Sequence, residues 1–160
     1  MSIPVEPPDG SVVRFHMGGQ RGYWYVAVRR GKRWETTSSG GLELEPGEER
    51  LPGMWDIREI ETWRHLAPQV RQFEVVTAWD SVGSRDPRVR KHLAVVRFSI
   101  AGHYLAGVFI SHDHSGRGDW YTTISDENDE ELPYADWQEW SAIKRHGQHI
   151  QVATGWATLS

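Results

Sequence analysis

Apolar and polar residues alternate over two short stretches that lie far apart in the chain. Residues 12–17 read Val-Val-Arg-Phe-His-Met, and residues 95–100 read Val-Val-Arg-Phe-Ser-Ile. A period of two is typical of a strand that buries one face. Each stretch is followed by a run of aromatic and β-branched residues, at 23–28 and 104–110. Because such residues favour strands, we expect a pair of neighbouring strands at both places.

A different spacing follows later in each half of the chain. Apolar residues recur at every third position, as Met54, Ile57, Ile60 and Trp63 and again as Tyr134, Trp137, Trp140 and Ile143. Spacing by three places side chains along one stripe of a helix, so we expect one helix in each half. A last strand is expected after each helix, at 73–79 and 150–156, where apolar residues alternate again.

These elements come twice in the same order, and short matching sequences mark the correspondence. The matches are residues 12–15 with 95–98, 34–37 with 120–123, 51–52 with 132–133, and 73–79 with 150–156. Self-similarity in a fixed order indicates a repeat architecture. The sequence therefore predicts an α+β fold that is a tandem duplication of a β-β-β-α-β unit. Each unit would place one helix on a small antiparallel sheet, which could curl toward a barrel.

The chain divides into four parts. Residues 1–8 are rich in proline, and we expect them to form an extended N-terminal arm. Residues 9–82 are the first predicted unit, and residues 92–160 are the second. Residues 83–91 carry four bases and one acid, and we interpret this segment as a basic linker between the units.

Composition excludes several classes of protein. The 160 residues include nine Trp and no Cys, and the net charge is −4. Without cysteine there are no disulfides, no thiolate zinc sites and no thiol catalysis. No apolar run approaches the ~18 residues of a membrane span, and the first residues do not resemble a secretion signal. We therefore expect a folded cytoplasmic protein, without membrane association, whose small core contains tryptophan.

The densest cluster of basic residues lies at a predicted hairpin turn. This turn is surrounded by Arg29, Arg30, Lys32 and Arg33. Trp24 precedes them on the strand predicted before the turn. Their cationic groups could hold phosphates while an aromatic ring stacks on a base. A solvated hairpin turn is the simpler interpretation, and the net acidity of the chain weakens the nucleic-acid one.

Two histidines, His112 and His114, occupy the corresponding turn of the second unit. Residues at i and i+2 of a strand end face the same way, so the two rings could share a metal. They are weaker candidates, because no complete ligand set accompanies them, and an exposed polar turn is the favoured interpretation.

The acidic segment 126–131 has glutamate at its sixth position, where a calcium-binding EF-hand loop has glycine. The sequence contains no known catalytic motif, so we expect neither an enzyme nor a cofactor.

Two polar pairs are repeated between the predicted units. Arg14 corresponds to Arg97, and Thr37 corresponds to Thr123. These pairs could line two equivalent ligand sites. A structural role is the favoured interpretation, because threonine is also simply a residue that suits strands.

A resemblance adds an expectation about function. Residues 10–15, the aromatic hairpin after them and the Trp-Tyr-Thr-Thr type of sequence at 120–123 resemble small accessory proteins of actinobacteriophages. The resemblance implies a protein that acts in the cytoplasm of a bacterial host, and it supplies no catalytic residue. We therefore expect a non-enzymatic phage accessory protein that binds a host protein. The alternatives are sequestration of a small nucleotide-like ligand, or nucleic-acid binding through the basic hairpin.

Overall fold

The computed structural model describes residues 3–17, 23–37, 60–100, 102–111, 117–123 and 140–159. The first five strands are β1 (Val12–Met17), β2 (Tyr23–Arg30), β3 (Arg33–Thr36), β4 (Ile60–Glu61) and β5 (Phe73–Ser81). The other four are β6 (Val95–Ile100), β7 (His103–Ser111), β8 (Gly118–Thr122) and β9 (Gln148–Leu159). The helices of this part are α1 (Trp63–Leu66), α2 (Trp140–His146) and the 3-10 helices η2 (Ala67–Gln69) and η3 (Pro87–Arg90).

All nine of these strands belong to one antiparallel sheet. Their order is β4-β3-β2-β1-β5-β9-β6-β7-β8. The order starts at β4 and ends at β8, so the sheet does not close into a barrel within the described residues. The expected combination of an antiparallel sheet with short helices is confirmed.

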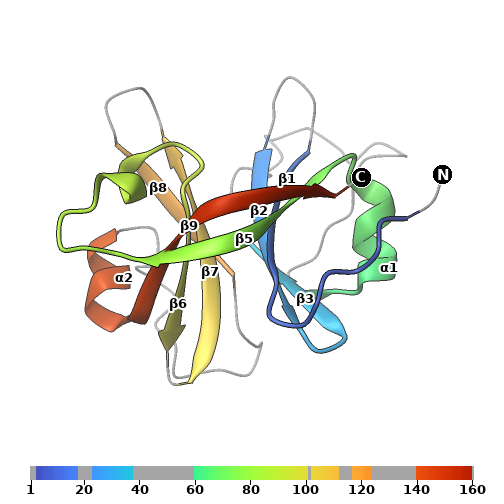
Figure 1. Ribbon diagram of the computed structural model, residues 1–160, viewed down its shortest axis with the longest axis horizontal. Coiled ribbons are helices and arrows are strands. Elements are labelled where there is room, and N and C mark those ends of the chain that lie inside the picture. Colours follow the sequence, from blue (N-terminus) through green and yellow to red (C-terminus); the bar gives the residue numbers. More distant parts are fainter. Residues whose placement is uncertain are drawn as a thin grey trace, which may run out of the picture.

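The sheet bends into two lobes, which Figure 1 shows side by side. The first lobe consists of β1–β4 with α1, and the second lobe consists of β6–β8 with α2. The long strands β5 and β9 lie next to each other and run across both lobes. In their antiparallel register Val76 lies opposite Trp156, and Trp79 lies opposite Ala153. The two halves of the chain therefore share one continuous set of backbone hydrogen bonds.

Each lobe contains its own hydrophobic core between its strands and its helix. The main residues of the first core are Val13, Phe15, Tyr25, Trp34, Trp63, Leu66 and Phe73. The main residues of the second core are Val96, Phe98, Leu105, Phe109, Trp120, Ile143 and Val152. The alternation in the sequence identified Val13, Phe15, Val96 and Phe98 of these cores, because side chains of successive strand residues point to opposite faces.

A third core joins the two lobes. It contains Val12, Val26 and Val28 from the first lobe and Val95, Ala106 and Val108 from the second. These residues lie on the faces of β1, β2, β6 and β7 that point away from the first two cores. The central strands are therefore buried on both sides, which explains why apolar residues such as Val12 and Val13 follow each other directly.

The helix expected from the three-residue spacing in the first half does not continue through Ile60. The prediction is wrong at Ile60, which belongs to β4 and lies opposite Glu35 of β3. Thr62 has an extended backbone and its side-chain oxygen accepts a hydrogen bond from the backbone N–H of His65, so α1 begins only at Trp63. Met54 and Ile57 lie outside the described residues.

The helix of the second half is confirmed at its C-terminal end. α2 contains Trp140 and Ile143 at the expected spacing of three, and Ile143 is fully buried. Tyr134 and Trp137 lie outside the described residues. Basic residues in the last turn of α2 complement the negative end of the helix dipole.

The predicted arm and linker both contact the lobes. Residues 3–8 have no regular secondary structure, and the carbonyl oxygen of Pro4 accepts a hydrogen bond from the indole N–H of Trp63 at 2.9 Å. Within the segment 83–91, Val89 is 3 % exposed and packs in the second core. This segment is therefore anchored in the fold.

Candidate ligand site between the two lobes

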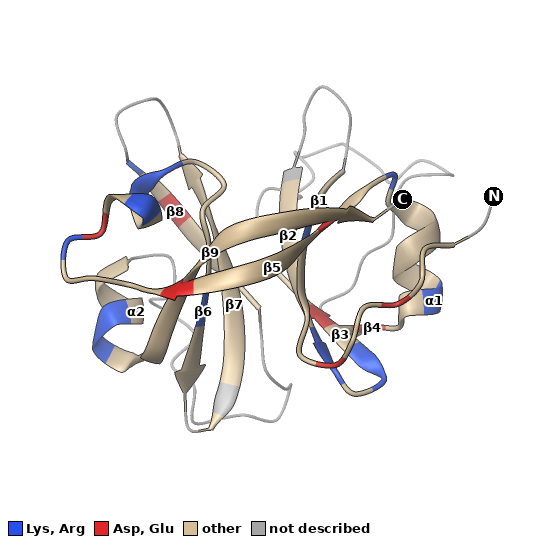
Figure 2. Ribbon diagram, viewed as in Figure 1, with Lys and Arg blue, Asp and Glu red and all other residues tan. Residues whose placement is uncertain are grey.

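The four basic residues predicted as a binding cluster do lie together at the β2–β3 hairpin, and Figure 2 shows this end of the first lobe in blue. Arg29 forms an ion pair with Glu6 at 3.0 Å. Arg30 forms an ion pair with the buried carboxylate of Glu35 and donates a hydrogen bond to the backbone of Tyr104. Two of the four cations are therefore already balanced by carboxylates of the chain.

Trp24 is not part of that cluster. It lies near the opposite end of β2, six residues before Arg30, where the ring of His16 packs at 5.1 Å from its own. A strand rises about 3.3 Å per residue, which separates the Trp24 backbone from the hairpin by about 20 Å. Trp24 cannot stack on a base whose phosphate is held by Lys32 in the turn.

The metal candidates His112 and His114 lie outside the described residues. Among the residues that the structure does describe, no group of three or more His, Cys, Asp or Glu side chains could hold a metal ion. The described helices include none that is long and apolar enough to span a membrane.

A pair of arginine–tryptophan contacts links the two halves of the chain, and sequence analysis missed it. The guanidinium of Arg14 lies 3.8 Å from the ring centre of Trp156, and that of Arg97 lies 4.4 Å from the ring centre of Trp79. Each arginine stands on the first strand of one half, and each tryptophan stands on the last strand of the other. The contacts therefore cross between the halves in opposite directions.

The polar partners of the two arginines occupy matching places in the sheet. Arg14 lies opposite Glu74 in the β1–β5 register, and Arg97 lies opposite Gln151 in the β6–β9 register. The Nη2 of Arg14 donates to Glu74 at 3.0 Å, and the Nε of Arg97 donates to Gln151 at 2.7 Å. One arginine thus faces a carboxylate, whereas the other faces a neutral amide.

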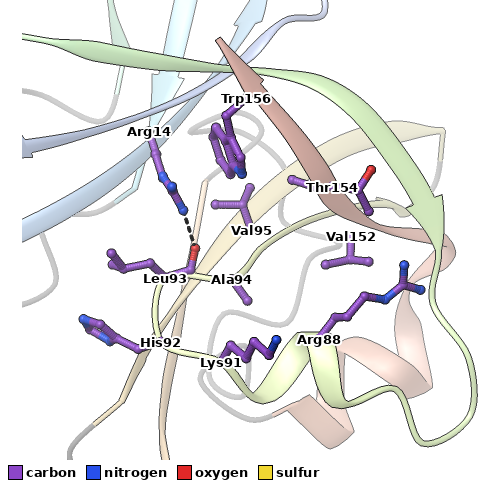
Figure 3. Close-up of a pocket in the computed structure, with 11 residues that line it drawn as sticks. Arg14, Arg88, Lys91, His92, Leu93, Ala94, Val95, Val152, Thr154 and Trp156 are labelled. Atoms are coloured by element: carbon purple, nitrogen blue, oxygen red, sulfur yellow. Dashed lines mark hydrogen bonds between the residues drawn. The ribbon is translucent and has the colours of Figure 1, made fainter. Parts of the chain in front are cut away.

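A pocket of about 330 Å³ opens beside Arg14, and we call it the Arg14 pocket. Figure 3 shows Arg14, Arg88, Lys91 and Trp156 around it. The Nη1 of Arg14 donates to the carbonyl oxygen of Leu93 at 2.9 Å, which the dashed line in Figure 3 marks. No acidic side chain of the described residues lines the pocket.

Arg88 of this pocket is strongly paired. It donates to Asp86 at 2.6 Å and to Asp80 at 2.7 Å. The hydrogen bond from Arg88 holds the pKa of Asp86 well below its usual range. The same ion pair raises the pKa of Arg88, so this guanidinium is a permanent cation.

A second pocket, of about 390 Å³, opens beside Arg97, and we call it the Arg97 pocket. Its wall includes Arg29, Arg30, Asp9 and Tyr104. Tyr104 is a large apolar side chain with considerable exposure, at 47 %. The pocket therefore combines several guanidinium groups with an accessible aromatic ring.

Burial lowers the pKa of Arg97. The direction of this shift shows that the surroundings solvate the guanidinium less well than water does. Within the described part of the chain no carboxylate pairs with Arg97, and its one polar partner is Gln151. The site therefore presents a cation that a negatively charged ligand would stabilise.

Comparison with protein-family models, with curated proteins and with solved structures gives no match. The functional interpretation therefore depends on the geometry of the site.

The repeated pairs in the sequence predicted part of this arrangement. Arg14 and Arg97 each line a pocket, whereas the favoured interpretation gave these pairs a structural role. Thr37 and Thr123 instead lie opposite each other in an isolated β-bridge and are both buried. The recurrence of Trp79 as Trp156 was visible in the sequence, but only the pairing of β5 with β9 brings each ring to an arginine of the other half.

Proposed function

We propose that the protein is a non-enzymatic binding protein for a small anionic ligand of the nucleotide type, held at the boundary between the two lobes. The observation that supports this proposal most is the pair of pockets beside Arg14 and Arg97, each lined by several cations in a protein of net charge −4. The chain as a whole is acidic, so these local groups of cations do not simply reflect an excess of basic residues.

The size and chemistry of the pockets suit such a ligand. Volumes of 330 to 390 Å³ lie at the lower end of the range for small-molecule sites. Guanidinium groups bind phosphate through two parallel hydrogen bonds, and an accessible ring such as Tyr104 can stack on a base. A mononucleotide fits this description better than a long polymer.

The proposal departs from the host-protein partner that the sequence favoured. Among the described residues, large apolar side chains are exposed only at Ile3, Val5 and Tyr104. A protein-binding surface usually buries aromatic and aliphatic anchors at its centre. Ile3 and Val5 flank Pro4, which is hydrogen-bonded to Trp63 of α1 in the first lobe, whereas Tyr104 stands on β7 of the second lobe. A phage accessory protein that sequesters a nucleotide inside its host is the form of the proposal that fits the resemblance.

We also propose that the fold arose by duplication of one β-β-β-α-β unit. Support comes from the register of the strands: Val13 pairs with Val75 in the first half, and Val96 pairs with Val152 at the matching places of the second. Val12 and Val95 likewise take matching places in the third core. The two crossed arginine–tryptophan contacts are then related by one approximate two-fold axis between β5 and β9.

Isothermal titration calorimetry tests the proposed function. We expect nucleoside mono- or diphosphates to bind, and the uncharged nucleosides to bind far more weakly, with affinity that falls as salt rises. Absence of binding by every nucleotide, together with capture of one dominant protein from a bacterial lysate, would overturn the proposal in favour of a protein partner. Tighter binding of single-stranded oligonucleotides than of mononucleotides would favour the nucleic-acid alternative.

A further inference from the structure

We propose that the two pockets are not equivalent and that the anion binds in the Arg97 pocket, because the chain's own Glu74 already occupies the guanidinium of Arg14. This inference rests on the proposed function and names the pocket that carries it.

The difference comes from one pair of nearly isosteric side chains. Glu74 and Gln151 stand directly opposite Arg14 and Arg97 in their ladders, and each accepts a hydrogen bond from its arginine. Glutamate neutralises the guanidinium, whereas glutamine accepts the hydrogen bond and leaves the positive charge unbalanced. Glu74 thus balances the charge of Arg14, whereas no carboxylate of the described residues pairs with Arg97.

Arg97 also retains donors for a ligand. Its Nε donates to Gln151, and among the described residues no partner is found for its Nη1 and Nη2 atoms. In Arg14 the corresponding two atoms donate to Leu93 and Glu74. Two free donors on one planar group match two oxygens of a phosphate, which is the geometry of a bidentate contact.

The other charged groups around the Arg97 pocket do not replace the missing anion. Glu35 pairs with Arg30, and Glu6 pairs with Arg29. Asp9 accepts a hydrogen bond from the backbone N–H of Gly31 at 2.8 Å, so this carboxylate holds the hairpin turn. Glu6 and Glu35 are therefore balanced by arginines, and Asp9, which lines the pocket, is bonded to the hairpin turn and forms no ion pair with Arg97.

Two aromatic side chains flank the guanidinium of Arg97, and one of them, Tyr104, also lines the pocket. Trp79 covers one side of the Arg97 guanidinium at 4.4 Å, and the Tyr104 ring lies 5.9 Å from the same group. Trp79 restricts the orientation of the guanidinium, which lowers the entropic cost of binding an anion. Tyr104, which is about half exposed, is free to stack on a base while the phosphate contacts Arg97.

Substitution Gln151→Glu tests this inference with adenosine diphosphate as the probe. The introduced carboxylate would form with Arg97 the ion pair that Glu74 forms with Arg14, so we expect the affinity for the probe to fall at least tenfold. The same ion pair should leave the thermal midpoint of unfolding unchanged or higher. Loss of binding with unimpaired stability cannot be explained by misfolding.

Glu74→Gln is the matched control, because it makes the reverse change at the corresponding place in the other half. We expect this variant to bind the probe with at least the wild-type affinity. If wild type binds and Gln151→Glu retains full affinity, the inference is overturned and the proposed function stands. If wild type binds neither this probe nor any other nucleotide, the proposed function itself fails.

Discussion

Arg14 and Arg97 each lie against a tryptophan ring that belongs to the opposite half of the chain. Each such cation–π contact contributes about 0.5–2 kcal/mol, depending on how well water is excluded. Trp156 and Trp79 are also packed against the third core. Each of these tryptophans therefore connects one arginine to the packing between the lobes.

Replacing Trp156 by leucine should lower the free energy of unfolding by about 1–3 kcal/mol, because both the cation–π contact with Arg14 and part of the apolar packing are lost. Replacement by phenylalanine should cost less, since a ring remains. Urea denaturation followed by circular dichroism measures the difference. Equal losses in the two variants would show that the stacked ring contributes nothing.

The Asp86–Arg88 pair predicts a dependence of stability on acid. Because the pKa of Asp86 is lowered in the folded protein, the unfolded chain takes up its proton first, near the ordinary value of 3.8. The stabilisation is fully present above that pH and is lost as the pH falls toward the folded pKa. Asp86→Asn should therefore be less stable than wild type at pH 7 and should lose less stability between pH 5 and pH 2. Urea midpoints at several pH values measure this, and parallel curves for the two proteins would contradict it.

At the scale of elements, the longer strands were predictable from the sequence, whereas the short strand β4 and the helix boundaries were not. The alternation at 12–17 identifies β1 because strand periodicity depends only on which side chains are buried. The start of α1 depends on pairing between β4 and β3, which are far apart in the chain. Ile60 fits the helical stripe by spacing, yet its backbone is used by the sheet.

Thr62 determines where α1 begins, and its removal should be measurable. The side-chain oxygen of Thr62 accepts a hydrogen bond from the backbone N–H of His65 at 3.3 Å. Thr62→Ala should therefore cost about 1 kcal/mol of stability, which is typical for loss of a helix N-cap. Thr62→Ser keeps the acceptor and should be close to wild type in the same urea titration. A serine variant as unstable as the alanine variant would exclude a capping role.

The site itself could be predicted only in part. Sequence analysis identified the repeated Arg14 and Arg97, because equal side chains at matching positions are visible in a comparison of the two halves. It favoured the hairpin cations Arg29 and Arg30, whose charges the fold pairs with Glu6 and Glu35. Whether a cation is balanced by a distant carboxylate depends on tertiary contacts, and local sequence does not reveal them.

At the scale of the whole molecule, the lobes are not independent domains. β5 and β9 cross both lobes, and the third core takes residues from each. Neither half can bury its own valines at this boundary without the other. Both pockets lie at this same boundary, so a ligand bound in either of them would stabilise the folded state.

The shared core predicts that the protein unfolds in one cooperative step. Tryptophan fluorescence, which reports rings in all three cores, and far-ultraviolet circular dichroism, which reports the sheet, should give the same urea midpoint. Separate transitions for the two signals would show that one lobe is stable while the other is unfolded. That outcome would contradict the continuous packing between them.

The most direct test of anion binding between the lobes is a ¹⁵N nuclear magnetic resonance titration with adenosine diphosphate. The Nε–H of Arg97 is hydrogen-bonded to Gln151 and gives a signal distinct from the backbone. The indole N–H groups of Trp79 and Trp156 report the surroundings of Arg97 and Arg14 separately, because each ring lies against one of these guanidinium groups. We expect the Arg97 and Trp79 signals to shift in a saturable way while the Trp156 signal stays in place. Saturable shifts confined to Trp156, or no saturable shift at any of these groups, would contradict the account.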